Sequence, residues 1–489
     1  MAQLLDKAVS FFSTSEAHPQ RWQLAAITAA TVVCLPVGIW KNLPFVAAIP
    51  AVMLLAWLTL VDFRKVFFLM LAAIPVSIEV SIGSFGTDLP SEPLIWVLYL
   101  SAIAWFLKSG RRAVDVRFVR HQLTLLLFLH LSWMLFTAAI SQDAVVSVKF
   151  VIAKTWYVVV FYFLAGRLLD SEQNLRNLVW AFFLPLLGTV LWVLVRHAPT
   201  GFEFDTVNFV MGPFYRNHVM YACVQAIFLP FLWYATYWYR RWSWRWWVLV
   251  LGIVTLLVGI NFAYTRAAYV ALVAAVVIYW CIRARLMKMV LVAAVLVLTL
   301  IIGWVTSRDN YLLFAPDFQR AVTHKEFDNL LEATTKLEDI SVMERVYRWV
   351  AAAYMIQDRP LAGFGPGCFY FFYTDYTVTS FQTYVSDNPE RSGIHCYYLM
   401  TAVEQGLPGA AIFLLFCAAV MLYGERVYHQ TTELWRRRML VAALLSFMLI
   451  CLLMFMNDFV ETDKIGSFFF MAVAILVNTD LQNKSKASF

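Results

Sequence analysis

Long apolar runs recur along almost the whole chain, and they restrict its fold more than any other feature. A membrane-spanning helix needs about 20 mainly apolar residues. Fourteen candidate runs lie near 23–40, 43–61, 66–82, 92–108, 122–140, 149–166, 176–196, 218–239, 246–264, 267–282, 287–306, 396–423, 439–457 and 465–478. Some neighbouring runs could form one bent element. The sequence therefore predicts an all-α integral membrane protein, a polytopic bundle of about 12–14 transmembrane helices.

The composition excludes a soluble enzyme. Of the 489 residues, 62% are hydrophobic and 14% are charged, whereas a soluble domain is about half apolar and a quarter charged. The net charge of +7 could suggest a nucleic-acid partner. The Lys and Arg residues, however, form short clusters between apolar runs, where they report topology. We expect membrane lipids around the chain and no nucleic acid.

The basic clusters also predict the orientation and organisation of the chain. With the N-terminus in the cytoplasm, most of the short basic loops fall on the cytoplasmic side. The long segment before His395 then faces outward, and it includes a predicted helix at 341–358. The expected parts are a cytoplasmic or interfacial segment 1–22, a transmembrane bundle 23–306, a large outer loop 307–394, C-terminal transmembrane helices 395–478 and a cytoplasmic tail 479–489.

Three ionisable residues at outer span ends are the first candidates for function: Arg216, Arg266 and His395. Outward-facing arginines in short loops are exceptional, and for each alone snorkelling or an ion pair is an equally good explanation. Two arginines and a histidine at one depth favour an anionic ligand, because guanidinium groups bind phosphate oxygens through paired hydrogen bonds. The ligand class that this predicts is a phosphorylated lipid.

Other charged residues allow more than one interpretation. Arg345 and Arg348, one helical turn apart, could line a cleft or pair with nearby glutamates. Lys154 could contact lipid headgroups or pair internally. The acids of the last outer loop, at 458–463, are simplest to interpret as a solvated turn. No compact acidic motif suggests a metal site, so we expect no metal and no cofactor.

Cys368 and Cys396 are the two cysteines expected outside the spans. They could form a disulfide in an oxidising compartment or remain free thiols.

The region from about 345 to 409 carries a family resemblance. A helix with Trp349 leads into a glycine turn (Pro360–Phe369), and His395 is followed by Gly406 and Gly409. This pattern resembles the bacterial O-antigen ligase and polymerase superfamily. The family pattern usually has Asn, Ser or Gln after the histidine and Thr after the second glycine, where this chain has Cys396 and Ala410.

The resemblance implies a GT-C-like glycosyltransferase on the periplasmic face of a Gram-negative inner membrane, with one large periplasmic loop. A ligase would transfer O-antigen from undecaprenyl diphosphate to lipid A core with inversion and without a metal. Arg216 and Arg266 would bind the diphosphate, and His395 would accept the proton of the attacking hydroxyl. The supporting positions would be Arg345, Arg348, Glu404, Gly406 and Gly409.

Several alternatives fit the same features. An O-antigen polymerase or a protein O-oligosaccharyltransferase would use the same donor with a different acceptor. From another class, a lipid or polysaccharide transporter would also have many spans and intramembrane charges. Transporters often show repeated halves, and none is evident here. A monomer is expected.

Overall fold

The computed structural model describes residues 19–82, 85–110, 115–307, 310, 340–381, 386 and 393–487. Most of the predicted N-terminal segment 1–22 and much of the predicted loop 307–394 therefore lie outside the described residues. The chain divides into two compact units, Met1–Met70 and Leu71–Phe489.

The first unit contains α2 (Pro19–Trp40) and most of α3 (Pro44–Ala73). Helix α3 is interrupted at Asp62, whose φ of −157° and ψ of 87° are not helical. The apolar runs predicted at 43–61 and 66–82 therefore share this one kinked element up to Ala73.

A β-hairpin near the start of the second unit corrects the prediction of an exclusively helical chain. Strands β1 (Ile78–Ile82) and β2 (Phe85–Leu89) pair antiparallel, with Glu79 opposite Asp88. The predicted helix 66–82 was wrong for its last residues. Pro75 lacks the amide hydrogen that a continuing helix needs, and alternating Ile78, Val80 and Ile82 have the two-residue period of a strand.

The rest of the second unit is helical. Its first half contains η1 (Ile74–Val76), α4 (Ser91–Ser109), α5 (Val116–Val119), α6 (Gln122–Ala139), α7 (Ala144–Val158), the π-helix η3 (Val159–Leu164), α8 (Ala165–Leu168), α9 (Glu172–His197), η4 (Ala198–Thr200), η5 (Phe204–Thr206), α10 (Val207–Met211), α11 (His218–Ala235) and η6 (Thr236–Trp238). Its second half contains α12 (Trp244–Asn261), α13 (Arg266–Arg283), α14 (Met287–Thr306), α16 (Ile340–Asp358), α17 (Phe369–Phe372), η8 (Tyr373–Tyr376), η9 (Thr379–Phe381), α18 (Tyr397–Gln430), α19 (Leu434–Leu453), η10 (Phe459–Glu461) and α20 (Asp463–Ala487). Helix α16 matches the predicted helix 341–358, and α20 continues through most of the predicted tail.

Polar side chains define where several helices begin. Asp143, Ser171, Asn217 and Ser243 precede α7, α9, α11 and α12, and each side chain accepts a backbone N–H of the first turn. Such N-caps satisfy donors that have no partner within the helix. They fix where the apolar spans start and therefore where the loops between them lie.

Ten helices of the described residues are long and apolar enough to cross a membrane. They agree with the predicted multi-span architecture, although 12–14 spans were expected. Helices α4 and α19, which match the predicted runs 92–108 and 439–457, are not among the ten.

The core of the second unit lies around α11, α19 and α20. In the apolar stretches of α20 and α11, 83% and 78% of the residues are buried, against none in α14. Phe182 of α9 and Phe228 of α11 pack against Phe468 of α20, with ring centroids 4.7 and 5.6 Å away. Helices α9, α11 and α20 thus pack tightly in the interior of the unit. Helix α14, in contrast, presents its apolar side chains outward, as a lipid-facing helix does.

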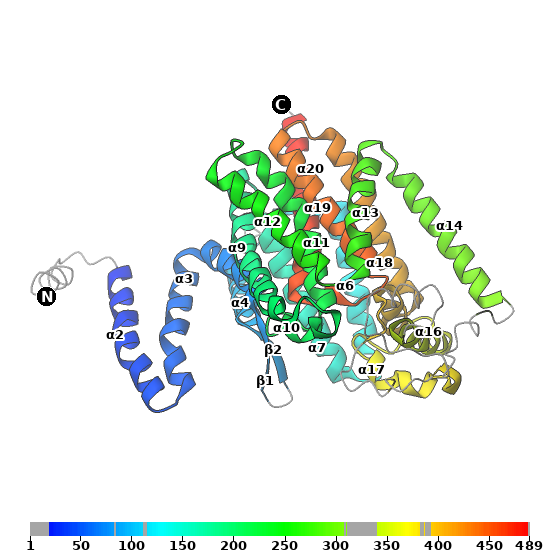
Figure 1. Cartoon of the computed structure of the whole chain (residues 1–489), viewed down its shortest axis with the longest axis horizontal. Helices are drawn as coiled ribbons and strands as arrows, with labels where there is room; N and C mark the ends of the chain where they lie inside the picture. The colour runs from blue at the N-terminus through cyan, green and yellow to red at the C-terminus, as the bar shows by residue number, and fades with distance from the viewer. Residues whose placement is uncertain are drawn as a thin grey trace, which may run out of the picture. The chain divides into compact units, whose positions relative to one another are not determined.

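The spans of the second unit alternate in direction and so define two ends (Figure 1). One end, here called the loop end, carries the hairpin, α10, α16, α17 and the turns at 140–143, 212–217, 262–265 and 454–462. The opposite end, here called the basic end, carries the clustered arginines Arg240, Arg241, Arg245, Arg283, Arg285, Arg436, Arg437 and Arg438. All three first candidates, Arg216, Arg266 and His395, lie at the loop end.

Candidate functional site

The two halves of the sequence motif meet at a kink in α18. Gly406 interrupts this helix with φ 70° and ψ 175°. The glycine turn packs on the interruption through backbone hydrogen bonds. The N–H of Phe364 donates to the carbonyl of Val403 at 3.0 Å, and the N–H of Leu407 donates to that of Pro360 at 2.8 Å. The glycine turn and the helix that follows His395 therefore form one structural unit.

Two glycines make this close approach feasible. Gly363 and Gly406 both have positive φ, 67° and 70°. A Cβ on Gly363 would overlap the backbone of Val403, and one on Gly406 would overlap the carbonyl of Leu361. Because backbone atoms cannot move aside as a side-chain end can, only glycine fits at both positions.

The predicted supporting residues Glu404 and Gly409 also hold this unit together. Glu404 is 2% exposed, and its carboxylate accepts the backbone N–H of Phe369 at 3.2 Å. Gly409 lies against the indole of Trp133, whose Nε1 donates to the carbonyl of Gln405 at 2.8 Å. These contacts give both residues a structural part in the packing of α18 on the glycine turn and on α6.

Helix α16 holds the segment that leads to His395. Arg348 Nη1 donates to the carbonyl of Gly393 at 2.9 Å, and Trp349 Nε1 donates to that of Ile394 at 3.2 Å. Arg348 is 4% exposed and also lies 3.6 Å from the carboxylate of Glu344. Arg348 therefore pairs with Glu344, as one of the two interpretations has it, and also contacts the segment that leads to His395.

His395 has an unusual backbone conformation, with a φ of 60°. Few residues other than glycine adopt this left-handed region, and such outliers cluster at functional sites. The N–H of His395 donates to Oδ2 of Asp458 at 3.2 Å. The carbonyl contacts from α16 on one side and the Asp458 carboxylate on the other hold the histidine in this conformation.

Burial and the neighbouring charges together determine the protonation state of the His395 imidazole. Burial, together with the positive charges of Arg348 and Arg345, lowers the pKa of the His395 imidazole to about 3. Burial raises the pKa of the Asp458 carboxyl to about 6, against the opposing effect of its hydrogen bond with His395. Near pH 7 the histidine is therefore neutral, with a lone pair available, while the aspartate is charged.

The structure contradicts the interpretation of the last outer loop as a solvated turn. Asp458 bonds the His395 backbone, Glu461 lies 2.6 Å from the ammonium of Lys154, and Asp463 is 2% exposed and accepts from Ser91. Lys154 thus pairs internally. Sequence analysis missed Asp458 because its partner lies 63 positions away in the chain, and only the fold brings the two together.

The Arg216 and Arg266 segments lie side by side in a second cluster. Arg216 precedes Asn217, the N-cap of α11, and Arg266 is the first residue of α13. The Thr265 hydroxyl is 3.3 Å from the carbonyl of His218, so the starts of the two helices touch. Arg216 is exposed and Arg266 is half-buried. The structure therefore brings the segments of the two arginines together at the loop end.

Both cysteines of the motif region are free thiols. Cys368 and Cys396 are buried, and the Cys368 sulfur lies 3.4 and 3.5 Å from the hydroxyls of Ser141 and Ser147. Of the two alternatives that the sequence left open, the structure has the unbridged one.

Within the described ranges, no three His, Cys, Asp or Glu side chains are grouped so that they could hold a metal ion. Metal independence stays a prediction, to be tested with a chelator.

The fold defines a multi-pass membrane protein, and the candidate site residues lie at one end of its helical bundle. Comparison with protein families gives one match. The O-antigen ligase family matches residues 251–414, from α12 into the first part of α18. This match supports an O-antigen ligase-like member of the O-antigen ligase and polymerase superfamily. No curated protein matches the chain.

Enzymes of this superfamily are glycosyltransferase-like and act on lipid-linked sugars and membrane lipids, so the match favours an enzyme of that kind. The matched segment contains Arg266, the glycine turn and His395. Arg216 lies before it.

Proposed function

We propose that the protein is an O-antigen ligase, which transfers O-antigen polysaccharide from undecaprenyl diphosphate to lipid A core in lipopolysaccharide biosynthesis. The observation that carries this proposal is the family match across residues 251–414, which includes the unit built from the glycine turn and His395. The location of that unit at the loop end, opposite the clustered arginines, supports a periplasmic site in an inner membrane.

The reaction would be a single displacement at the anomeric carbon of the donor sugar. A hydroxyl of the acceptor core attacks that carbon, the bond from the carbon to the phosphate oxygen breaks, and undecaprenyl diphosphate leaves. Attack on the face opposite the leaving group inverts the configuration. The hydroxyl proton passes to a base, and His395 is the candidate.

The surroundings of His395 fit this part. Because the pKa of its imidazole is lowered to about 3, the side chain is neutral and can accept a proton. The bound diphosphate would offset the positive charges of Arg348 and Arg345, which would raise the basicity of the imidazole when substrate is present. A base whose strength rises on substrate binding accepts the proton at the step where the hydroxyl attacks.

Arg216 and Arg266 would bind the diphosphate. The leaving group gains negative charge as the bond breaks, and a guanidinium already in place stabilises that charge. The contact between Thr265 and His218 keeps the two arginines' helix starts adjacent, as one diphosphate would require.

The test is an in vitro transfer assay with purified protein, undecaprenyl-diphosphate-linked glycan and lipid A core, with and without EDTA. Transfer to the core that persists in EDTA and is lost in His395→Ala is the expected result. Lengthening of the donor glycan would instead show a polymerase, and transfer to a polypeptide a protein O-oligosaccharyltransferase. With none of these products, movement of the donor lipid across proteoliposome membranes would show a transporter.

A further inference from the structure

An ion pair between a buried lysine and a half-buried glutamate lies next to the segment of His395, and the proposed chemistry gives it no part. Lys154 of α7 is 4% exposed. Its ammonium lies 2.6 Å from the carboxylate of Glu461 and donates to the hydroxyl of Tyr397 at 3.3 Å. The three residues come from α7, from η10 and from the start of α18, so one ammonium joins three elements that are distant in sequence.

Both partners of Lys154 are connected to His395, one through the chain and one through hydrogen bonds. Tyr397 follows His395 by two residues, and Glu461 belongs to the same short turn as Asp458, with its N–H donating to the Asp458 carbonyl at 3.2 Å. The Asp458 carboxylate in turn accepts the N–H of His395. Lys154 therefore fixes the His395 segment from two sides, through the first residue of α18 and through the turn that carries Asp458.

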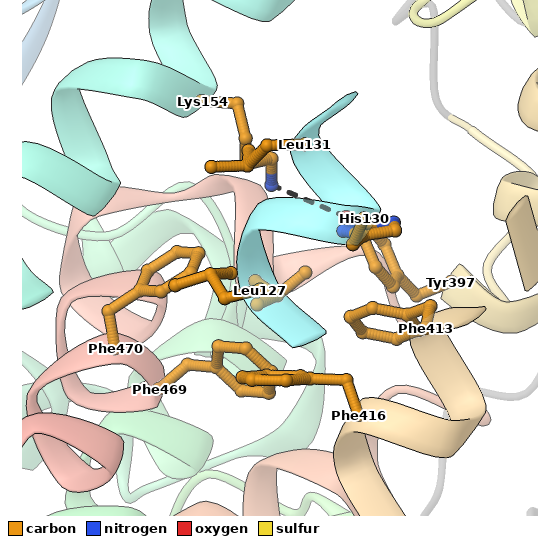
Figure 2. Close-up of a pocket in the computed structure, with 10 residues that line it drawn as sticks. Leu127, His130, Leu131, Lys154, Tyr397, Phe413, Phe416, Phe469 and Phe470 are labelled. Atoms are coloured by element: carbon orange, nitrogen blue, oxygen red, sulfur yellow. Dashed lines mark hydrogen bonds between the residues drawn. The ribbon is translucent and has the colours of Figure 1, made fainter. Parts of the chain in front are cut away.

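The same ammonium lines a small pocket in the bundle interior. Figure 2 shows Lys154, His130 and Tyr397 around this pocket, with Phe413 and Phe469 among its apolar walls. The pocket is about 10 Å³ in volume, room for no more than one water molecule. Its walls leave Lys154 little freedom to move, so its contacts are held in one geometry.

Stability alone does not account for such a pair. Moving an ion out of water costs several kcal/mol, and replacing both partners of a buried pair by well-packed neutral side chains is often neutral or stabilising. What a neutral replacement cannot reproduce is the directed contact of one ammonium with two anchored oxygen atoms. The geometry that the pair imposes is therefore its most direct effect.

We propose that Lys154 is a positioning residue for His395. Through Glu461 and Tyr397 it holds the Asp458 turn and the start of α18 in register, and so keeps His395 in its left-handed conformation. This inference rests on the proposed function for its effect on rate, and on the structure alone for its effect on the geometry of His395.

The test compares wild type with Lys154→Met/Glu461→Gln, which removes both charges together and leaves neither ion unpaired. We expect the double variant to fold, with kcat for transfer lower by about 10- to 100-fold and KM for the donor within about twofold, because a small displacement of the base affects the chemical step. Lys154→Arg, which keeps the charge, should recover part of the lost kcat.

The matched control is Asp480→Asn at the basic end. Asp480 and His121 form a pair that is even more deeply buried than Lys154 and Glu461, with side chains 3% and 2% exposed and 3.1 Å apart. This variant should lose thermal stability and keep the wild-type kcat below its melting temperature. Equal losses of kcat in the control and the double variant would overturn the positioning role, because they would show a general effect of instability.

A second readout needs no activity. Modification of His395 by diethyl pyrocarbonate, followed by mass spectrometry, should be faster in the double variant than in wild type and unchanged in Asp480→Asn. Unchanged modification in the double variant would overturn the inference. If wild type itself transfers no glycan, the proposed function fails, while the modification rates still test whether Lys154 positions His395.

Discussion

The two ends of the bundle carry their charges in opposite ways. At the loop end, two of the charged side chains are buried and held by named partners: Arg348 and Lys154 are each 4% exposed. At the basic end, Arg240 and Arg241 are exposed. Both ends are rich in ionisable residues. At the loop end, Arg348 and Lys154 are held in position by hydrogen bonds and ion pairs.

Buried and exposed charged residues have different effects in a membrane protein. Burying an ion costs several kcal/mol unless its partners are well placed. The buried charged side chains at the loop end are therefore held in position by their partners. Exposed arginines cost little and contribute about 0–1 kcal/mol through surface pairs. Their effect is on the orientation of the chain in the membrane. Changes to the buried charges at the loop end should therefore be costly, and changes to the surface arginines at the basic end should be mild.

The largest effect is expected for His395→Gly. Transfer should fall by about 10²- to 10⁴-fold, the usual contribution of a general base. Stability should be unchanged or higher, because glycine adopts the φ of 60° without strain. The measurements are the transfer rate and the melting temperature of the purified variant. A variant that transfers at the wild-type rate would remove His395 from the proposed mechanism.

The next largest effect is expected for Gly406→Ala. The added Cβ would overlap the carbonyl of Leu361 at a residue with φ 70°, so the variant should lose about 2–4 kcal/mol of stability. The control is Gly188→Ala in α9, where a Cβ meets nothing within 4 Å. There, alanine should stabilise the helix by up to about 1 kcal/mol. Similar melting temperatures for the two variants would contradict the packing described for the glycine turn.

An intermediate effect is expected from pH. The pKa of Asp458 is raised to about 6, so its carboxylate is charged above that pH and protonated below it. As pH falls through about 6, the charge that offsets Arg348 beside His395 is lost. Transfer should then decline by up to about tenfold per pH unit. Rates measured from pH 5 to 8 should show this inflection in wild type, and Asp458→Asn should lack it.

The smallest effect is expected for Arg438→Ala at the basic end. The guanidinium of this half-buried residue lies 4.3 Å from the centre of the Tyr237 ring, and a cation–π contact contributes about 0.5–2 kcal/mol, more where it is desolvated. The melting temperature should fall slightly and transfer should be unchanged. A loss of transfer as large as that of His395→Gly would contradict the expected difference between substitutions at the two ends.

The chain by itself determined the class of fold and most of the candidate site positions. Runs of about 20 apolar residues can satisfy their backbone hydrogen bonds in a membrane only as helices or closed barrels, so a multi-span helical architecture followed from hydropathy. The exception was the hairpin at 78–89, where a proline and a two-residue alternation marked the end of the helix. The positions of His395, Arg348 and the glycine turn were also visible, because their spacing is local.

Only the tertiary structure decided which residues touch. From the sequence, Asp458 was interpreted as an acid of a solvated turn, and Lys154 was left open between a headgroup contact and an internal pair. Each has a partner within the fold because α6, α7, α18 and the turn before α20 converge at one end of the bundle. The left-handed backbone of His395 is likewise imposed by contacts from α16 and from Asp458. Local spacing predicts helices and turns because their hydrogen bonds are short-range. Burial and pairing depend on segments tens to hundreds of residues apart, and only packing brings these together.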